Sequence, residues 1–147
     1  MTIKEKENVI IEEFSIFDDW MDKYAHLIEL GKELPVIDEQ YKTNQYLITG
    51  CQSRAWLFAE VDESGKVFFT ADSDAVITKG IISLLIKVLS GNTPKDILDA
   101  DLGFLEKIGL KEHLSPTRAN GLVSMVKQIQ FYARAFQLKS NVKKMKR

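Results

Sequence analysis

The stretch AWLFAEVDESGKVFFT, residues 55–70, predicts the centre of the fold. Aromatic and aliphatic residues, which favour β-strands, dominate its two ends. The residues between them, Asp-Glu-Ser-Gly at 62–65, have the composition of a turn. The stretch therefore predicts two strands, residues 55–61 and 67–70, that pair antiparallel through a short connection.

The segment just upstream predicts a third strand and the loop that follows it. Tyr46-Leu47-Ile48 has strand character, and Gly50-Cys51-Gln52-Ser53 falls between this strand and residue 55. Three strands with short connections indicate an antiparallel meander.

Helical patterns occupy the rest of the chain. Residues 9–34 predict one helix, with Ser15 or Asp18 as a possible cap. Residues 75–89 are apolar nearly all round, which is typical of a central helix packed on several sides. Further helices are expected to begin at Thr93-Pro94, near residue 101 and at Ser115-Pro116.

One glycine in the central helix predicts a close contact. Gly80 follows Lys79 inside the apolar run, although glycine weakens a helix by about 1 kcal/mol relative to alanine. We expect another backbone to approach Gly80, and the Cys51 loop is one candidate.

These elements predict an α+β fold. A small three-stranded antiparallel sheet packs against several helices, and 147 residues suit a single domain. We expect its core to span about residues 9–138 and the basic tail, residues 139–147, to be solvated and frayed.

Charge and hydropathy exclude several classes of function. The net charge is -1 at pH 7, so no cationic field attracts nucleic acid or anionic lipid. The most apolar stretch, residues 81–89, is interrupted by Lys87 and is too short to span a bilayer. The first residues lack the pattern of a signal or transit peptide. We therefore expect a cytoplasmic protein with no membrane or nucleic-acid partner.

The chain holds one cysteine, Cys51, and two histidines, His26 and His113. These counts exclude an internal disulfide, a CxxC redox pair and a cysteine-ligated zinc or iron–sulfur site built within one chain. Any thiol chemistry must therefore run between Cys51 and another molecule.

Cys51 is the first candidate functional residue. Gly50 permits a positive φ or a close backbone approach, and Gln52 and Ser53 are polar. A loop of this composition presents a thiol to a partner without rebuilding the sheet. The alternative is that Cys51 is only a small buried hydrophobe, in a protein whose role is to bind partners.

Two charged residues complete the candidate site. If Ser115 caps the last helix, Arg118 lies at its third position, where the helix dipole disfavours a cation. Arg118 is therefore a candidate cation that supports the Cys51 thiolate, with a structural ion pair as the alternative. Asp74 lies in an acidic segment that can position a partner. The alternative, which is compatible with that role, is that Ser73 or Asp74 caps the central helix.

A stand-alone cysteine hydrolase is the rival function. Cys51, His113 and Asn120 are the residue types of a Cys-His-Asn hydrolase, in that chain order. Against this function, His113 lies in a charged run, and the chain offers little room for a substrate cleft.

Several short segments of the chain form an ordered set. They are Tyr24 with LIELG at 27–31, LP at 34–35, GCQS at 50–53 with WL at 56–57, ADSDA at 71–75 with KG at 79–80, and LSPTRANGL at 114–122. In this set, from about Phe17 to Phe136, the chain resembles the SufE-like family of proteins associated with Fe–S metabolism. Thr117 departs from the serine that the family often carries, and it keeps the hydroxyl.

The resemblance implies an α+β fold and a sulfur-transfer role. By this resemblance, Cys51 accepts sulfane sulfur from a pyridoxal-phosphate-dependent cysteine desulfurase of the SufS or CsdA type, stimulates that enzyme, and passes the sulfur to an iron–sulfur scaffold. Pyridoxal phosphate belongs to the partner, so we expect no cofactor or metal on this chain, and an accessory carrier of persulfide sulfur rather than an enzyme. We also expect Cys51 to be partly buried at rest and to swing out on docking, because a persulfide is easily oxidised.

Overall fold

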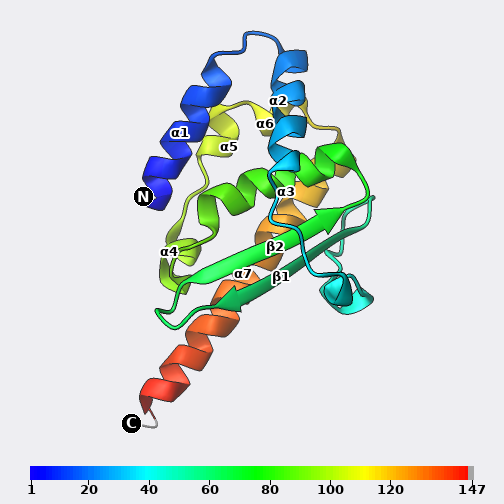
Figure 1. Ribbon diagram of the computed structural model, residues 1–147. Helices are drawn as coiled ribbons and strands as arrows, with labels where there is room; N and C mark the ends of the chain where they lie inside the picture. The colour runs from blue at the N-terminus through cyan, green and yellow to red at the C-terminus, as the bar shows by residue number, and fades with distance from the viewer. Residues whose placement is uncertain (146–147) are drawn as a thin grey trace.

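A central helix, α3, and a two-stranded sheet lie at the middle of the molecule, with the other helices around them (Figure 1). The computed structural model describes residues 1–145. Its elements are α1 (Ile3–Ser15), α2 (Trp20–Lys32), the 3₁₀ helices η1 (Glu39–Tyr41) and η2 (Asn44–Tyr46), β1 (Ala55–Val61), β2 (Val67–Ser73), α3 (Val76–Leu89), α4 (Pro94–Asp99), α5 (Phe104–Lys107), α6 (Leu110–His113) and α7 (Pro116–Met145). The predicted single α+β domain is confirmed.

The predicted hairpin is present. β1 and β2 pair antiparallel from Ala55 opposite Ser73 to Val61 opposite Val67. Burial alternates along both strands, as expected when one face of a sheet packs on a core.

The predicted third strand is wrong. Residues 44–46 form a 3₁₀ turn, and Leu47 makes only an isolated bridge to Trp56. Ile48 donates its N–H to the carbonyl of Ala55 at 2.7 Å, and the chain then turns away at Gly50. The pairing is therefore too short to make a strand, and the sheet of the described residues has two strands.

The predicted single helix over residues 9–34 is also wrong, because α1 and α2 are separate helices joined by residues 16–19 (Figure 1). Asp19, rather than Ser15 or Asp18, caps α2 by accepting a hydrogen bond from the Met21 N–H at 2.8 Å. Both helices pack one face on α3, so the apolar spacing continues across the break.

The prediction of a buried central helix is confirmed. Most of α3 is buried, and α1, α2, α7 and β2 surround it. The close approach predicted at Gly80 is present, since a Cβ there would lie 2.4 Å from the carbonyl oxygen of Leu27. Its neighbour is helix α2, so the suggestion that the Cys51 loop packs there is wrong. The N-cap of α3 is Ala75, without a side-chain cap, so capping by Ser73 or Asp74 is wrong too.

The helix starts predicted at Thr93-Pro94 and Ser115-Pro116 are confirmed, whereas α6 (Leu110–His113) was not predicted. Thr93 accepts a hydrogen bond from the Asp96 N–H at 3.2 Å, and Ser115 accepts one from the Arg118 N–H at 3.3 Å. The helix expected near residue 101 begins at Phe104, as α5.

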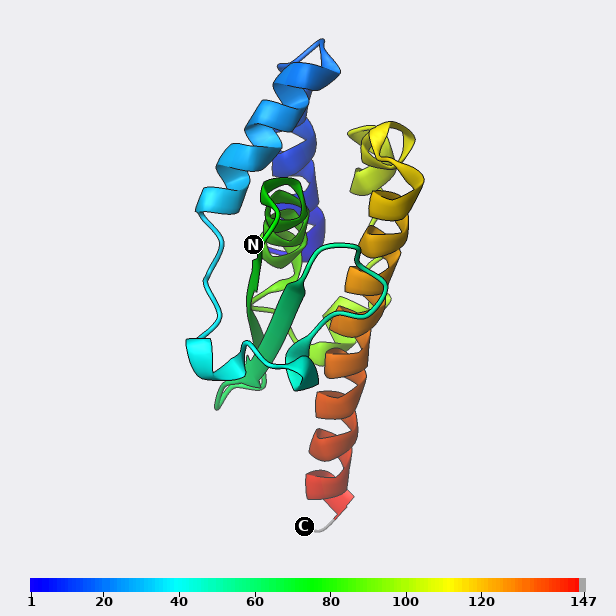
Figure 2. The ribbon, with the colours of Figure 1, turned by 90° about the vertical axis from the view of Figure 1, so that its right-hand side faces the viewer.

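Helix α7 packs on α3, α4 and β1 and then projects beyond the sheet (Figures 1 and 2). The basic segment expected as a frayed tail continues this helix to Met145, with Lys139 and Lys143 exposed. Lys146 and Arg147 lie outside the described residues. Among residues 1–145, no helix combines the length and the apolar character that a bilayer crossing requires.

Candidate functional site

Cys51 lies half-buried in the loop that leads into β1, against the first turns of α7. Figure 2 shows this loop reaching across to α7. The Cys51 thiol points at the carbonyl oxygen of Gly121, with 3.8 Å between Sγ and oxygen. A Cβ on Gly121 would lie 3.4 Å from the same sulfur, so the thiol packs directly on the backbone of α7.

Gly50 gives the loop its shape, as the sequence predicted. Its φ is +92°, in the region that favours glycine. A Cβ at this position would also lie 2.3 Å from the Oγ of Ser124 in α7. Both the conformation and the contact therefore require glycine immediately before Cys51.

The other end of the loop is tied to the end of β2. The Arg54 N–H donates to the carboxylate of Asp74 at 3.1 Å, and the Asp74 N–H donates to the Arg54 carbonyl at 3.2 Å. The Ser73 hydroxyl donates to the same carbonyl at 2.8 Å. Asp74 thus holds the base of the loop.

A small cavity of about 60 Å³ adjoins Cys51. Its walls come from the Cys51 loop, α3 and the start of α7: Cys51, Gln52, Ser53, Thr78, Ile81, Thr117, Arg118, Gly121 and Met125. A cavity needs roughly 10–15 Å³ to hold one water molecule, so this one admits a larger group beside the sulfur. Three of the residues that line it, Ser53, Thr78 and Thr117, carry hydroxyl groups.

The electrostatics of the site favour a neutral thiol at rest. Burial raises the pKa of Cys51, because the thiolate loses hydration. Arg118 lines the same cavity from the first turn of α7. Within residues 1–145, no carboxylate lies within ion-pair distance of Arg118. The alternative that Arg118 forms a structural ion pair is therefore not supported within these residues.

The structure brings together four of the six predicted site residues. Cys51, Gln52, Ser53 and Arg118 line one cavity, whereas Gly50 and Asp74 lie at the two ends of the loop. Sequence reasoning missed the neighbours that α3 and α7 contribute, namely Thr78, Ile81, Gly121, Ser124 and Met125. Thr78 left a signal, since a buried hydroxyl is unusual in so apolar a helix.

His113 lies away from this site. Its ring stacks on Trp20 with 4.2 Å between centroids, its Nδ1 is 2.9 Å from the Gly109 carbonyl oxygen, and it does not line the Cys51 cavity. Asn120 is exposed and does not line the cavity either. The structure therefore does not assemble a Cys-His-Asn arrangement at Cys51.

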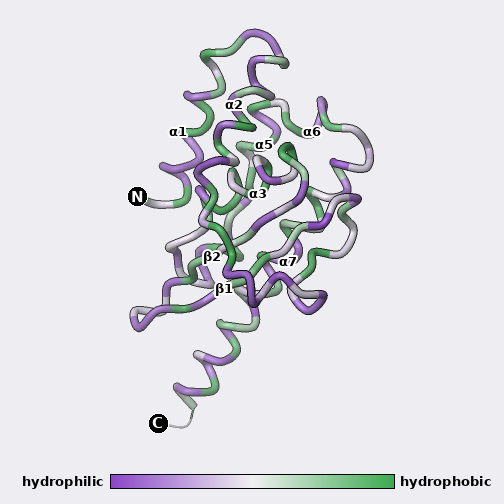
Figure 3. The backbone as a smooth tube through the Cα atoms, turned by 45° about the vertical axis from the view of Figure 1, so that its right-hand side comes forward, coloured by the Kyte–Doolittle hydropathy of each residue, from purple (hydrophilic) through white to green (hydrophobic). Residues whose placement is uncertain are grey.

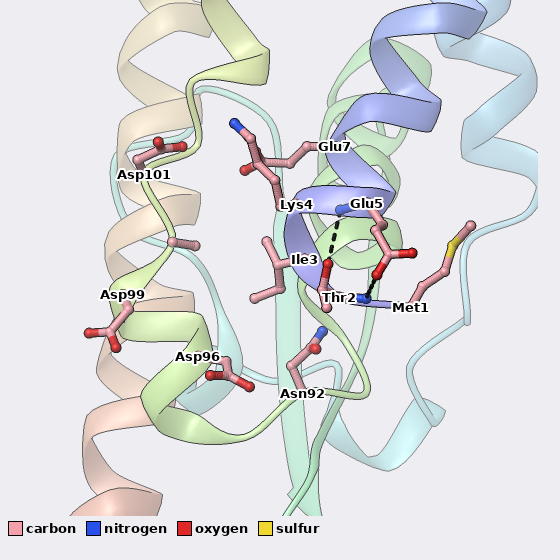
Figure 4. A pocket seen from close by; sticks show the side chains of 11 residues that line it. Met1, Thr2, Ile3, Lys4, Glu5, Glu7, Asn92, Asp96, Asp99 and Asp101 are labelled. Atoms are coloured by element: carbon pink, nitrogen blue, oxygen red, sulfur yellow. Dashed lines mark hydrogen bonds and ion pairs between the residues drawn. The ribbon is translucent and has the colours of Figure 1, made fainter.

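A second hollow, of about 690 Å³, lies between the start of α1 and the segment around α4 (Figure 4). It contains the buried Glu7, whose side chain points toward Asp101 in Figure 4. Burial and the nearby Asp101 charge raise the pKa of Glu7. No cysteine or histidine lines this hollow. Nor do residues 1–145 contain a group of three or more His, Cys, Asp or Glu side chains placed to hold a metal ion.

Comparison with known proteins decides the family. The model of the SufE family, described as an Fe-S metabolism associated domain, matches residues 8–133. The chain belongs to the SufE family. An uncharacterised SufE-like protein of Rhizobium meliloti is 39% identical over 82% of this chain and 89% of its own length. A second one, from Rhizobium etli, is 40% identical over 82% of this chain and 84% of its own length.

Two further comparisons extend the match. SufE-like protein 1, chloroplastic/mitochondrial, of Arabidopsis thaliana is 39% identical over 88% of this chain, which spans 35% of that longer protein. The solution structure of a hypothetical protein from Thermus thermophilus superposes with a TM-score of 0.75, covering 90% of this chain and 96% of the other. At 24% identity, that structure supports the fold alone.

Proposed function

We propose that this SufE-family protein accepts sulfane sulfur on Cys51 from the persulfide of a pyridoxal-phosphate-dependent cysteine desulfurase, in the cytoplasm. It thereby stimulates the desulfurase, and it delivers the sulfur to an iron–sulfur scaffold. One observation carries the proposal: the single cysteine of the chain lies on a loop, beside a small cavity that Arg118 also lines.

The proposed transfer is balanced in atoms and electrons. The Cys51 thiolate attacks the outer sulfur of the partner's persulfide, a new S–S bond forms on Cys51, and the partner's S–S bond breaks. The partner cysteine leaves as a thiolate and takes up the proton that Cys51 gave up. No oxidant or reductant is needed. The chain has no second cysteine that could form an internal disulfide with Cys51 and release the outer sulfur as sulfide.

Each neighbour of Cys51 has a role in this scheme. The cavity shelters the added sulfur from oxidants until the acceptor docks. Arg118 stabilises the anionic forms of the cysteine, thiolate and persulfide, as the loop moves out of its buried position. Gly50 and Asp74 hold the ends of the loop, so that Cys51 moves while the sheet stays in place.

The test is stimulation of a cysteine desulfurase, measured as alanine released from L-cysteine. We expect the wild-type protein to raise turnover and Cys51→Ser to abolish the increase. Arg118→Ala should reduce the increase by about tenfold, the order expected for one lost contact to a charged group, while Arg118→Lys keeps part of it. Circular dichroism should show that all three variants stay folded. Unchanged stimulation by Arg118→Ala would remove Arg118 from the site.

The rival hydrolase makes a different prediction. A hydrolase that uses Cys51 would turn over an ester or amide substrate alone and lose this activity in His113→Ala. Because His113 is stacked on Trp20 instead of lining the Cys51 cavity, we expect His113→Ala to leave desulfurase stimulation unchanged. Hydrolysis that depends on His113, together with no stimulation of any desulfurase, would favour the rival.

A further inference from the structure

Helix α7 is apolar on two opposite sides. One side, with Leu122, Met125, Ile129 and Ala133, is buried in the core. At 100° per residue, the positions Phe131, Ala135, Leu138, Val142 and Met145 fall on the other side of the helix. Figure 2 shows α7 at the edge of the molecule. Leu138 and Val142 of this stripe also line a hollow of about 910 Å³ that α7 shares with the β1–β2 connection, including Asp62 and Glu63.

The second side is exposed. The exposed fractions are 62% for Phe131, 61% for Leu138, 49% for Val142 and 86% for Met145. Most of this stripe lies on the part of α7 that projects beyond the sheet, where Figure 3 shows hydrophobic residues recurring between hydrophilic ones. Over 14 residue steps it is about 21 Å long.

The spacing of the stripe is that of a coiled-coil seam. Its five positions follow one another in steps of four, three, four and three residues, which is the a/d pattern of a heptad. They cover about 80° of the helix surface, narrower than the apolar face of a helix that packs on a broad core or lies in a membrane interface. The narrow width favours a single partner helix.

The charges beside the stripe select the kind of helix. Residues 116–145 contain no aspartate or glutamate. The exposed Arg134 and Lys139 occupy the flanking g and e positions, and these positions choose partners in coiled coils. A second copy of this chain would oppose Arg134 to Lys139 in a parallel pair, or each residue to its own copy in an antiparallel pair, and both arrangements repel.

We propose that the stripe formed by Phe131, Ala135, Leu138, Val142 and Met145 is a docking seam for an acidic amphipathic helix of another protein. The partner helix places apolar residues at its own a and d positions and Asp or Glu beside them, opposite Arg134 and Lys139. The seam does not include Cys51. Failure of this proposal would therefore leave the proposed function unaffected, and failure of the proposed function would leave this proposal unaffected.

The test uses a labelled synthetic peptide of about three heptads, with Leu at a and d and Glu at e and g. Self-repulsion keeps this peptide unpaired at neutral pH, and its matched control carries Lys in place of Glu. In fluorescence anisotropy with the full chain, we expect the Glu peptide to bind, more weakly as salt rises, and the Lys peptide not to bind. The double variant Leu138→Gln/Val142→Gln should weaken binding by about tenfold or more.

Two further variants make the test specific. Val76→Gln, at an exposed apolar residue outside α7, should leave binding unchanged. Lys139→Glu should weaken binding of the Glu peptide. No binding of the Glu peptide, equal binding of the Lys peptide, or an unchanged affinity in Leu138→Gln/Val142→Gln would overturn the proposal. So would self-association of the chain, or binding to vesicles with anionic lipid, if the double variant abolished either one.

Discussion

The Cys51 thiol is held against Gly121 in the free protein, half-buried and with a raised pKa. A nucleophile in this state reacts slowly until its surroundings change. Under the proposed function, the same burial would protect a persulfide from oxidants between two docking events. At the residue scale, low reactivity of the isolated protein is therefore part of the proposed function.

Alkylation by iodoacetamide measures this protection. We expect Cys51 to react more slowly than the thiol of an unstructured control peptide. The rate should rise with pH around a midpoint above that of the peptide, because burial raises the thiol pKa. Asp74→Ala removes the acceptor of the Arg54 N–H and should speed the reaction by loosening the loop. Equal rates for protein and peptide at every pH would contradict the sheltered thiol.

Glu7 gives an independent prediction about pH and stability. Its pKa is raised on folding, so the unfolded chain loses this proton at lower pH than the folded one does. Ionisation of Glu7 therefore lowers the free energy of unfolding. This loss develops as the pH rises from 4.5, the ordinary glutamate pKa, through the pKa of Glu7 in the folded protein. Glu7→Gln carries no charge, so its melting temperature should exceed that of the wild type at pH 7.

The difference between Glu7→Gln and wild type should shrink as the pH falls toward 4.5. Differential scanning calorimetry at several pH values checks this trend. A variant that melts below the wild type at pH 7 would mean that folding stabilises the charged form of Glu7. A difference that does not change with pH would mean that folding leaves the pKa of Glu7 unchanged.

At the element scale, local patterns predicted the hairpin, the central helix and the starts of α4 and α7, because turns, caps and apolar runs act over a few residues. Two features that depend on long-range packing were predicted wrongly. The break between α1 and α2 leaves the apolar spacing intact, and the third strand failed because residues 46–48 make only one bridge. Likewise, the sequence singled out Cys51 by the composition of its loop and Arg118 by its unfavourable place in a helix, whereas the contact of Cys51 with Gly121 depends on how α7 packs.

The contact between α2 and α3 can be tested at Gly80. Alanine favours a helix by about 1 kcal/mol over glycine, but its Cβ would lie 2.4 Å from the Leu27 carbonyl oxygen. We expect the steric clash to outweigh the higher helix propensity of alanine. Gly80→Ala should therefore lower the free energy of unfolding by roughly 1–3 kcal/mol. Urea denaturation measures this loss. Gly31→Ala, whose nearest contact would be 3.1 Å, is the matched control and should cost less. A stabilised Gly80→Ala would contradict the close packing.

At the scale of the whole molecule, the fold brings together a loop before the sheet, the central helix and the start of α7 around one thiol. The half of α7 that follows carries the exposed seam, away from the core. In our account the molecule is a carrier: it holds sulfur at one end of α7 and offers a second contact along the other end. Under the proposed function, the chemistry that releases the sulfur from cysteine belongs to the partner desulfurase.

The most direct test of this account is an intact mass. The protein is incubated with a cysteine desulfurase and L-cysteine, separated without reductant and weighed by mass spectrometry. We predict that the wild type gains the mass of one sulfur atom, that dithiothreitol removes it, and that Cys51→Ser gains nothing. An unchanged wild-type mass beside a desulfurase that is turning over, or the same gain on Cys51→Ser, would contradict the role of Cys51 as the sulfur acceptor.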